Sequence, residues 1–158
     1  MASYDDFILG WFMMKKITLL CLMIPQPLFA FCFDESGQYY NVDPALLKSI
    51  AIVESSLKPQ AYNENKDKQG KVISRDFGLM QINSHWFKTL APFGVNESNV
   101  YDPCFNVHLG AWVLSSNFAS HGFNWNSVGA YNAGFKLSNQ AARDIYIQKV
   151  KHEYAQLK

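Results

Sequence analysis

One acidic side chain in the first helical segment of this sequence falls on that segment's apolar face. Leu47, Ile50, Ala51 and Glu54 recur at the spacing of one face of an α-helix. A charged carboxylate among apolar side chains is costly, and desolvation raises its pKa toward neutrality. A general acid that works near neutral pH needs that property. The pattern predicts a catalytic acid/base at Glu54, and the alternative is a structural carboxylate paired with a buried Arg or Tyr.

A second carboxylate, Asp76, follows Glu54 by 22 residues, directly after a polar segment. Glycosidases generally use two carboxylates, one as the acid and the other as a nucleophile or a stabiliser of an oxocarbenium-like state. Asp76 could fill the second role if it faces Glu54 across a cleft. It could equally cap a helix that we expect to begin near Gly78. The sequence leaves both roles open.

Two Asp-Pro pairs predict the helices that carry this chemistry. Asp43-Pro44 supplies an N-cap and a first helical residue for a helix over 44–56, and Asp102-Pro103 opens a longer helix that stops at His121-Gly122. The polar composition of residues 63–76 predicts an irregular hairpin. We expect further helices from about 78 to 86, 127 to 132 and 138 to 155. The predicted fold class is α+β, predominantly helical, with a small β-hairpin after the first catalytic helix.

The composition fits one compact domain. The chain has 158 residues, of which 49% are hydrophobic and 15% aromatic. Lys and Arg number 14 against 13 Asp and Glu, and no window concentrates the basic residues, so the sequence argues against nucleic acid as a partner. The four histidines fall in no ligand motif, and we expect no metal and no cofactor.

The first thirty residues have the pattern of a signal peptide. Lys15 and Lys16 precede the apolar run 17–24, and a plausible cleavage site follows at Ala30. The apolar run is too short to span a bilayer comfortably, so we expect no stable membrane span after cleavage. Residues 1–12 lie upstream of the signal pattern, and we expect translation to start at Met13 or Met14. The mature chain, residues 31–158, is then a catalytic domain exported to the periplasm.

Export also changes the cysteine count. Cleavage after Ala30 removes Cys21 and leaves Cys32 and Cys104. An even pair of cysteines in an oxidising compartment predicts a disulfide between the mature N-terminus and the middle of the chain. The alternative is two unrelated buried thiols.

Four short motifs then follow one another along the mature chain. They are Glu54-Ser55-Ser56, Gly78-Leu79-Met80-Gln81-Ile82-Asn83, Ala130-Tyr131-Asn132-Ala133-Gly134, and Tyr146 four residues before Val150. Their order and spacing, over about residues 43–152, resemble the soluble lytic transglycosylase family. The resemblance implies a goose-type-lysozyme-like fold and cleavage of the β-1,4 bond between N-acetylmuramic acid and N-acetylglucosamine in peptidoglycan glycan strands.

The resemblance also implies a role for each matching residue. Glu54 takes the place of the catalytic acid/base, and Tyr131 that of the tyrosine that hydrogen-bonds it. Tyr146 corresponds to a second tyrosine of the groove. The other residues expected to contact the substrate are Ser55, Met80, Gln81 and Asn132. Enzymes of this kind use one acid, because the substrate's acetamido group assists and the muramic C6 hydroxyl attacks instead of water.

Small, signal-bearing chains with a cysteine pair especially resemble the specialised transglycosylases of conjugation, type IV pilus and type III secretion systems. That resemblance implies local opening of the cell wall and a secretion-apparatus protein as a partner. Residues 74–84 are also similar to the segment of animal-type lysozymes that carries their second carboxylate. A lysozyme-type muramidase hydrolase that uses Asp76 is therefore one alternative. A non-catalytic glycan-binding component of a secretion apparatus is another, although retention of Glu54 on an apolar face argues against it.

Overall fold

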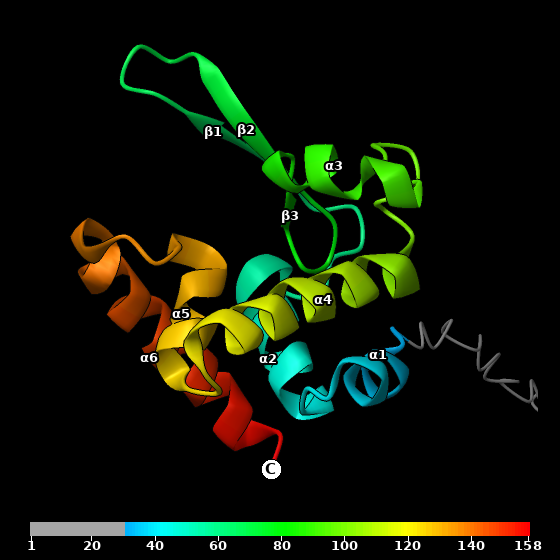
Figure 1. The fold of residues 1–158 in the computed structure, drawn as a ribbon, viewed down its shortest axis with the longest axis vertical. Helices are drawn as coiled ribbons and strands as arrows, with labels where there is room; N and C mark the ends of the chain where they lie inside the picture. The colour runs from blue at the N-terminus through cyan, green and yellow to red at the C-terminus, as the bar shows by residue number, and fades with distance from the viewer. Residues whose placement is uncertain (1–30) are drawn as a thin grey trace, which may run out of the picture.

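The computed structural model describes residues 31–158, so the predicted signal peptide and the proposed start lie outside the described residues. Figure 1 shows a helical body from which a β-hairpin stands out as an arm. The elements in chain order are α1 (Phe33–Tyr40), α2 (Pro44–Ser55), β1 (Tyr62–Lys66), β2 (Val72–Phe77), β3 (Ile82–Asn83), α3 (His85–Leu90), a 3₁₀ turn (Ala91–Phe93), α4 (Pro103–His121), α5 (Trp125–Ala133), a 3₁₀ turn (Leu137–Asn139) and α6 (Gln140–Gln156).

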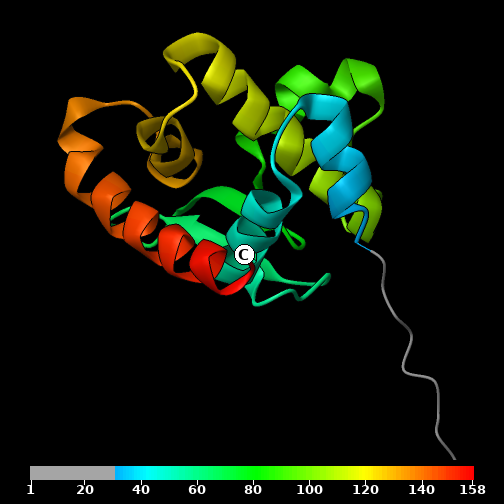
Figure 2. The same cartoon turned by 90° about the horizontal axis from the view of Figure 1, so that it is seen from below.

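The helix α2 occupies the centre of the body and begins where the Asp-Pro signal predicts. Asp43 caps it, because its Oδ1 accepts a hydrogen bond of 2.8 Å from the backbone N–H of Ala45. Asp102 caps α4 in the same way. Contacts join α2 to α1, α4 and α6, and in Figure 2 the C-terminal part of α6, in red, crosses in front of α2. The helices predicted near residues 127–132 and 138–155 are confirmed as α5 and α6.

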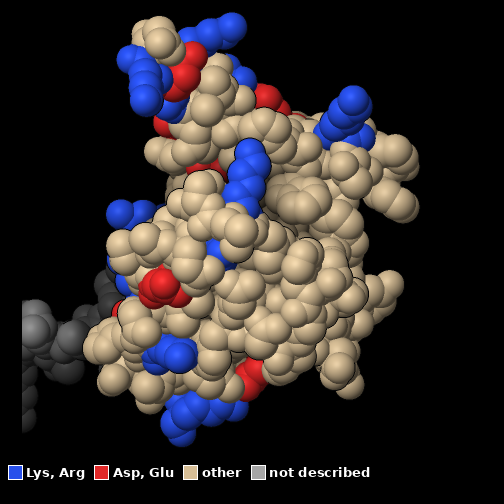
Figure 3. Space-filling view, turned by 60° about the vertical axis from the view of Figure 1, so that its left-hand side comes forward, with Lys and Arg blue, Asp and Glu red and all other residues tan. Residues whose placement is uncertain are grey.

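The small antiparallel sheet confirms the predicted hairpin and adds a third strand. Its order is β1-β2-β3. Charged side chains of both signs gather at the end of the hairpin, which stands out at the top of Figure 3. The register pairs Asp76 with Asn63 on one side and with Asn83 on the other. Asp76 therefore sits on the middle strand, between two asparagines that share its face of the sheet.

The predicted helix from about residue 78 to 86 is wrong. Residues 78–81 form a turn in which Gly78 and Gln81 have left-handed backbone angles, with φ of 76° and 48°. A helix cannot continue through such angles, and Ile82 instead pairs with Phe77 in the sheet. Only α3, which begins at His85, is helical in this segment. Because no helix starts near Gly78, the capping role considered for Asp76 is wrong as well.

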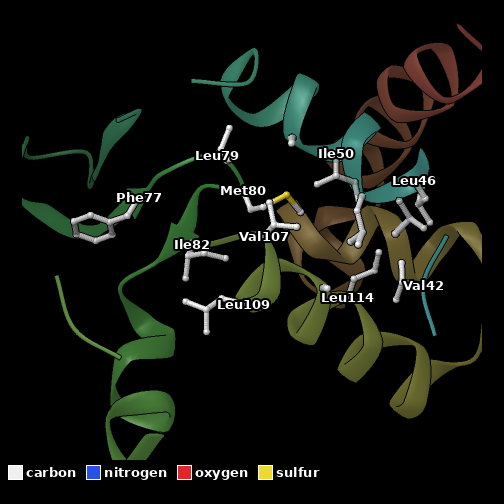
Figure 4. Packing of buried hydrophobic residues seen from close by; sticks show 14 of the residues in the cluster. Val42, Leu46, Ile50, Phe77, Leu79, Met80, Ile82, Val107, Leu109 and Leu114 are labelled. Carbon is white, nitrogen blue, oxygen red and sulfur yellow. The ribbon is translucent and has the colours of Figure 1, made fainter. Parts of the chain in front are cut away.

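The hydrophobic core lies between α2, the turn at residues 78–81 and α4. Met80 is fully buried there with Ile50 and Val107 (Figure 4). Gly110 of α4 lets the turn approach closely, because a Cβ at that position would lie 2.6 Å from Met80 Cε. The predicted disulfide is confirmed: Cys32 and Cys104 are bridged with Cα atoms 5.1 Å apart, which ties the start of α1 to the first turn of α4. Within residues 31–158, no helix has the length and apolar character needed to cross a membrane.

Candidate active site

Glu54 lies in the last turn of α2, where α6 passes close to it. The hydroxyl of Tyr146, a buried residue of α6, donates a hydrogen bond of 2.6 Å to Glu54 Oε1. Contacts between α2 and α6 fix this pair. The carboxyl group is therefore held in one orientation by a neutral donor rather than by an ion pair.

Burial raises the pKa of Glu54 to about 7, against the ordinary 4.5. The charge of Asp76 contributes to this increase, while the Tyr146 hydrogen bond and the charge of Lys149 oppose it. Burial also raises the pKa of Tyr131 and Tyr146 well above 10, so both tyrosines stay protonated. A carboxyl group with these properties can donate a proton at neutral pH and take one back.

Three asparagine amides hold the carboxylate of Asp76 on the sheet. Asn83 donates to Oδ1 at 2.6 Å, and Asn65 and Asn63 donate to Oδ2 at 2.7 and 3.1 Å. Hydrogen bonds of this kind fix the carboxylate without neutralising it. The structure thus places a fixed negative charge close enough to Glu54 to act on its ionisation.

The tyrosine that hydrogen-bonds Glu54 is not the one that the resemblance implies. Tyr146, not Tyr131, donates to Glu54. The hydroxyl of Tyr131 instead donates a hydrogen bond of 2.8 Å to the carbonyl of Met80. The expectation for Tyr131 fails because α5 directs its tyrosine at the 78–81 turn, whereas α6 packs directly on α2.

Two other residues expected to contact the substrate point into the protein. Met80 has no exposed surface and belongs to the core. Ser55 is buried, and its hydroxyl donates to the carbonyls of Leu79 and Ala51 at 2.8 and 3.1 Å. Both residues therefore tie the 78–81 turn to the helices instead of facing a groove.

Gln81 and Asn132, also expected to contact the substrate, are not fully buried. Gln81 is half-buried, and its side-chain amide donates a hydrogen bond of 3.0 Å to the Gly78 carbonyl. Asn132 is exposed and lines a pocket of about 280 Å³ with Glu54, Tyr146 and Lys149. Val53, Ala142 and Ile145 complete the lining. This pocket gives the Glu54 carboxyl an open approach from the α5–α6 side.

Asn106 of α4 is a positioning residue that the sequence did not reveal. It is fully buried, and its amide group donates to the carbonyls of Phe77 and Val100 at 2.9 and 2.7 Å. Its Oδ1 accepts a hydrogen bond of 2.7 Å from the Met80 N–H. Asn106 therefore fixes both ends of the turn that follows Asp76. Its place after an Asp-Pro helix start marks it only as a first-turn residue, so no sequence signal pointed to this role.

Residues 31–153 of the chain match the family of the transglycosylase SLT domain. The chain belongs to this family. SLT-domain enzymes of this kind are peptidoglycan lytic transglycosylases, and the site described above lies within the matched residues.

Relatives of similar length support the assignment to the SLT family. A peptidoglycan-binding-like protein of Escherichia coli O157:H7 is 39% identical over 129 residues, which cover 80% of this chain and 77% of that protein. The invasion protein IagB of Salmonella typhi is 37% identical over 143 residues, covering 90% of this chain and 86% of IagB.

A solved structure shows the fold of this SLT-domain chain. An inactive mutant of the lytic transglycosylase Slt from Pseudomonas aeruginosa superposes with a TM-score of 0.57 at 19% identity. The match covers 79% of this chain and 23% of the longer Slt chain. The predominantly helical, lysozyme-like α+β class predicted from the sequence is confirmed.

Proposed function

We propose that the chain cleaves the β-1,4 bond between N-acetylmuramic acid and N-acetylglucosamine and leaves 1,6-anhydromuramic ends, with Glu54 as the only acid/base. The observation that carries this proposal is the state of Glu54. It is buried, its pKa is raised to about 7, and the Tyr146 hydroxyl orients it. Half of the Glu54 side chains then carry a proton at neutral pH, which suits a group that both gives and takes one.

The reaction needs two proton transfers through Glu54. Its carboxyl proton first passes to the glycosidic oxygen as the bond from muramic C1 to that oxygen breaks, and the acetamido group of the muramic residue assists. The Glu54 carboxylate then accepts the proton of the C6 hydroxyl while the C6 oxygen bonds to C1. No water is consumed, and the carboxyl group returns to its protonated state. Tyr146 keeps Oε1 in one position through both steps.

We assign Asp76 an electrostatic role in this reaction. Its two oxygens accept hydrogen bonds from three amides, so the carboxylate is restrained on the sheet. A fixed negative charge stabilises an oxocarbenium-like state and keeps Glu54 protonated before the first transfer. The same observation favours one competing function, a lysozyme-type hydrolase in which Asp76 completes a two-carboxylate mechanism.

We further propose that the enzyme acts in the periplasm and opens the wall locally for a secretion, pilus or conjugation apparatus. The name of the relative IagB, an invasion protein, supports this context. Export through residues 1–30 and the Cys32–Cys104 disulfide are consistent with an oxidising compartment. The apparatus would supply a protein partner beside the glycan substrate.

The decisive experiment is the digestion of purified sacculi by the wild type and by Glu54→Gln. The amide keeps the shape of the side chain but cannot exchange the proton, so release of muropeptides should fall by at least about a hundredfold. Glu97→Gln, which removes the same charge from an exposed turn, should digest sacculi like the wild type. Mass spectrometry of the wild-type products separates the two functions, because an anhydro end is lighter than a reducing end by one water. Reducing ends would contradict the transglycosylase reaction and would show that the enzyme is a hydrolase.

A further inference from the structure

The pocket beside Glu54 has an electrostatic feature that the cleavage reaction does not use. Its lining residues come from α2, α5 and α6, and Lys149 is the cation among them. In the described part of the chain, the ion pairs involve Lys66, Arg75 and Lys158, and none of them includes Lys149. When Glu54 holds its proton, the pocket carries a net positive charge.

The helix α6 fixes where that charge lies. Ala142, Ile145, Tyr146 and Lys149 follow one another at i, i+3, i+4 and i+7, so they form one face of the helix. Lys149 is therefore one turn beyond Tyr146, the residue that holds Glu54. A group bound to the Lys149 ammonium would lie within the same pocket as the reacting bond.

The proposed substrate carries an anionic group close to the bond that is cleaved. The muramic residue bears a lactyl ether at C3, next to the C2 acetamido group and two atoms from C1. The lactyl group ends in a free carboxylate in strands without peptide. In strands with peptide it continues into a stem that has carboxylates of its own. Ile145, a lining residue that is 61% exposed, offers an apolar contact for the methyl groups of either.

We propose that Lys149 determines specificity in this enzyme by binding a carboxylate of the lactyl-peptide substituent of the muramic residue. The inference rests on the proposed function, since it places the muramic residue beside Glu54. An ammonium group on a flexible stem suits a carboxylate whose position shifts between the free lactyl group and the stem. Asn132, an exposed residue of α5 that also lines the pocket, can bond amide groups of the same substituent.

Binding of that carboxylate also favours the acid form of Glu54. The charged and titratable groups that face Glu54 are Tyr146 and Lys149 on α6, Tyr131 on α5 and Asp76 on β2. Of these, the charge of Lys149 lowers the Glu54 pKa. A bound carboxylate offsets this charge, so Glu54 is more fully protonated in the complex than in the free enzyme.

Three preparations of the same glycan strands test the proposal: strands with their peptides, strands stripped of peptide with free lactyl carboxylates, and stripped strands whose carboxylates are converted to methylamides. Lys149→Gln should lower kcat/KM by about tenfold on strands that carry the recognised carboxylate, as expected for a lost charge-assisted hydrogen bond. On the methylamides it should match the wild type within about twofold, and Lys149→Arg should restore most of the loss. A loss on stripped strands identifies the lactyl carboxylate, and a loss confined to peptide-bearing strands identifies the stem.

Lys151→Gln is the matched control. Lys151 lies on the same helix, but its ammonium sits 4.9 Å from the centre of the Trp125 ring, away from the pocket. An equal loss on all three preparations, no loss on any, or the same loss in Lys151→Gln would overturn the proposal. Binding of the three preparations to Glu54→Gln and to Glu54→Gln with Lys149→Gln gives the same comparison without turnover. If the wild type cleaves nothing, the proposed function fails, and this binding comparison still decides the role of Lys149.

Discussion

The hydroxyl of Tyr146 lies 2.6 Å from Oε1 of Glu54, although 92 positions separate the two residues in the chain. This contact joins the last turn of α2 to the middle of α6. Because it is the carboxyl group's hydrogen bond within the described structure, it sets both the orientation and part of the pKa of Glu54. The first prediction follows from its removal.

Tyr146→Phe should move the alkaline limb of the pH profile of activity to higher pH. The hydrogen bond lowers the pKa of Glu54, so its loss raises that pKa above the wild-type value of about 7. The acid form then persists to higher pH, while the maximal rate falls by about tenfold because the carboxyl is no longer oriented. Tyr131→Phe is the control, since its hydroxyl bonds Met80 and not Glu54. The measurement is the pH profile of kcat/KM. If the alkaline limb of Tyr146→Phe stays at the wild-type pH, this contact is contradicted.

Glu54→Gln should stabilise the protein at alkaline pH. The folded-state pKa of Glu54 is raised from 4.5 to about 7, so between these values the folded state holds a proton that the unfolded state releases. The free energy of unfolding therefore falls by about 3 kcal/mol as the pH rises through this window. Above the window it stays constant. The variant lacks this loss. Denaturant unfolding should show it more stable than the wild type at pH 8 and nearly equal at pH 4. Equal stabilities at pH 8 would contradict the raised pKa of Glu54.

Asp76→Asn separates the one-acid reaction from the two-acid reaction. The charge of Asp76 raises the pKa of Glu54, so the variant's alkaline limb should move downward. Under the one-acid reaction, activity at pH 6 should fall by only about tenfold, through weaker electrostatic support. Under the two-acid reaction the loss should approach that of Glu54→Gln. Asp144→Asn, on the exposed face of α6, is the charge-matched control and should leave both the rate and the limb unchanged.

Asn106→Leu should destabilise the fold and disorder the 78–81 turn. Leucine keeps the branched shape and the number of side-chain heavy atoms but removes three hydrogen bonds, and it leaves the Met80 N–H and the Phe77 and Val100 carbonyls without them. Unsatisfied buried groups of this kind cost about 1–3 kcal/mol each. Thermal unfolding should show a large drop in Tm. Gly78→Ala should act on the same contact, because its Cβ would clash with the side-chain amide of Asn106. A wild-type Tm in both variants would rule out this packing.

Reduction of the Cys32–Cys104 disulfide should lower stability much more than activity. The bridge closes a loop with a sequence separation of 72 residues. Restricting the unfolded chain over such a loop contributes about 4 kcal/mol. The Cys32→Ser, Cys104→Ser double variant should unfold at lower denaturant concentration yet keep its rate on sacculi at 25 °C. A large loss of rate in protein that is still folded would instead indicate that the position of α1 affects the site around Glu54.

Several elements of the fold could be predicted because their signals are local. The caps of α2 and α4 are set by Asp43 and Asp102, which bond backbone groups two or three residues away. The apolar spacing around Glu54 likewise depends only on helix geometry. The hairpin and the cysteine pair also followed from composition and from the expected compartment. These features need no knowledge of which elements pack together.

The tertiary structure alone decided how the site is assembled. Whether Tyr131 or Tyr146 reaches Glu54 depends on the packing of α5 and α6 against α2. The turn at residues 78–81 looked helical in sequence, but the left-handed angles at Gly78 and Gln81 and the buried amide of Asn106 hold it as a turn. Met80 faces the core for the same reason. Sequence spacing gives the face of a helix, whereas the partner of each face is chosen by long-range packing and hydrogen bonds between distant segments.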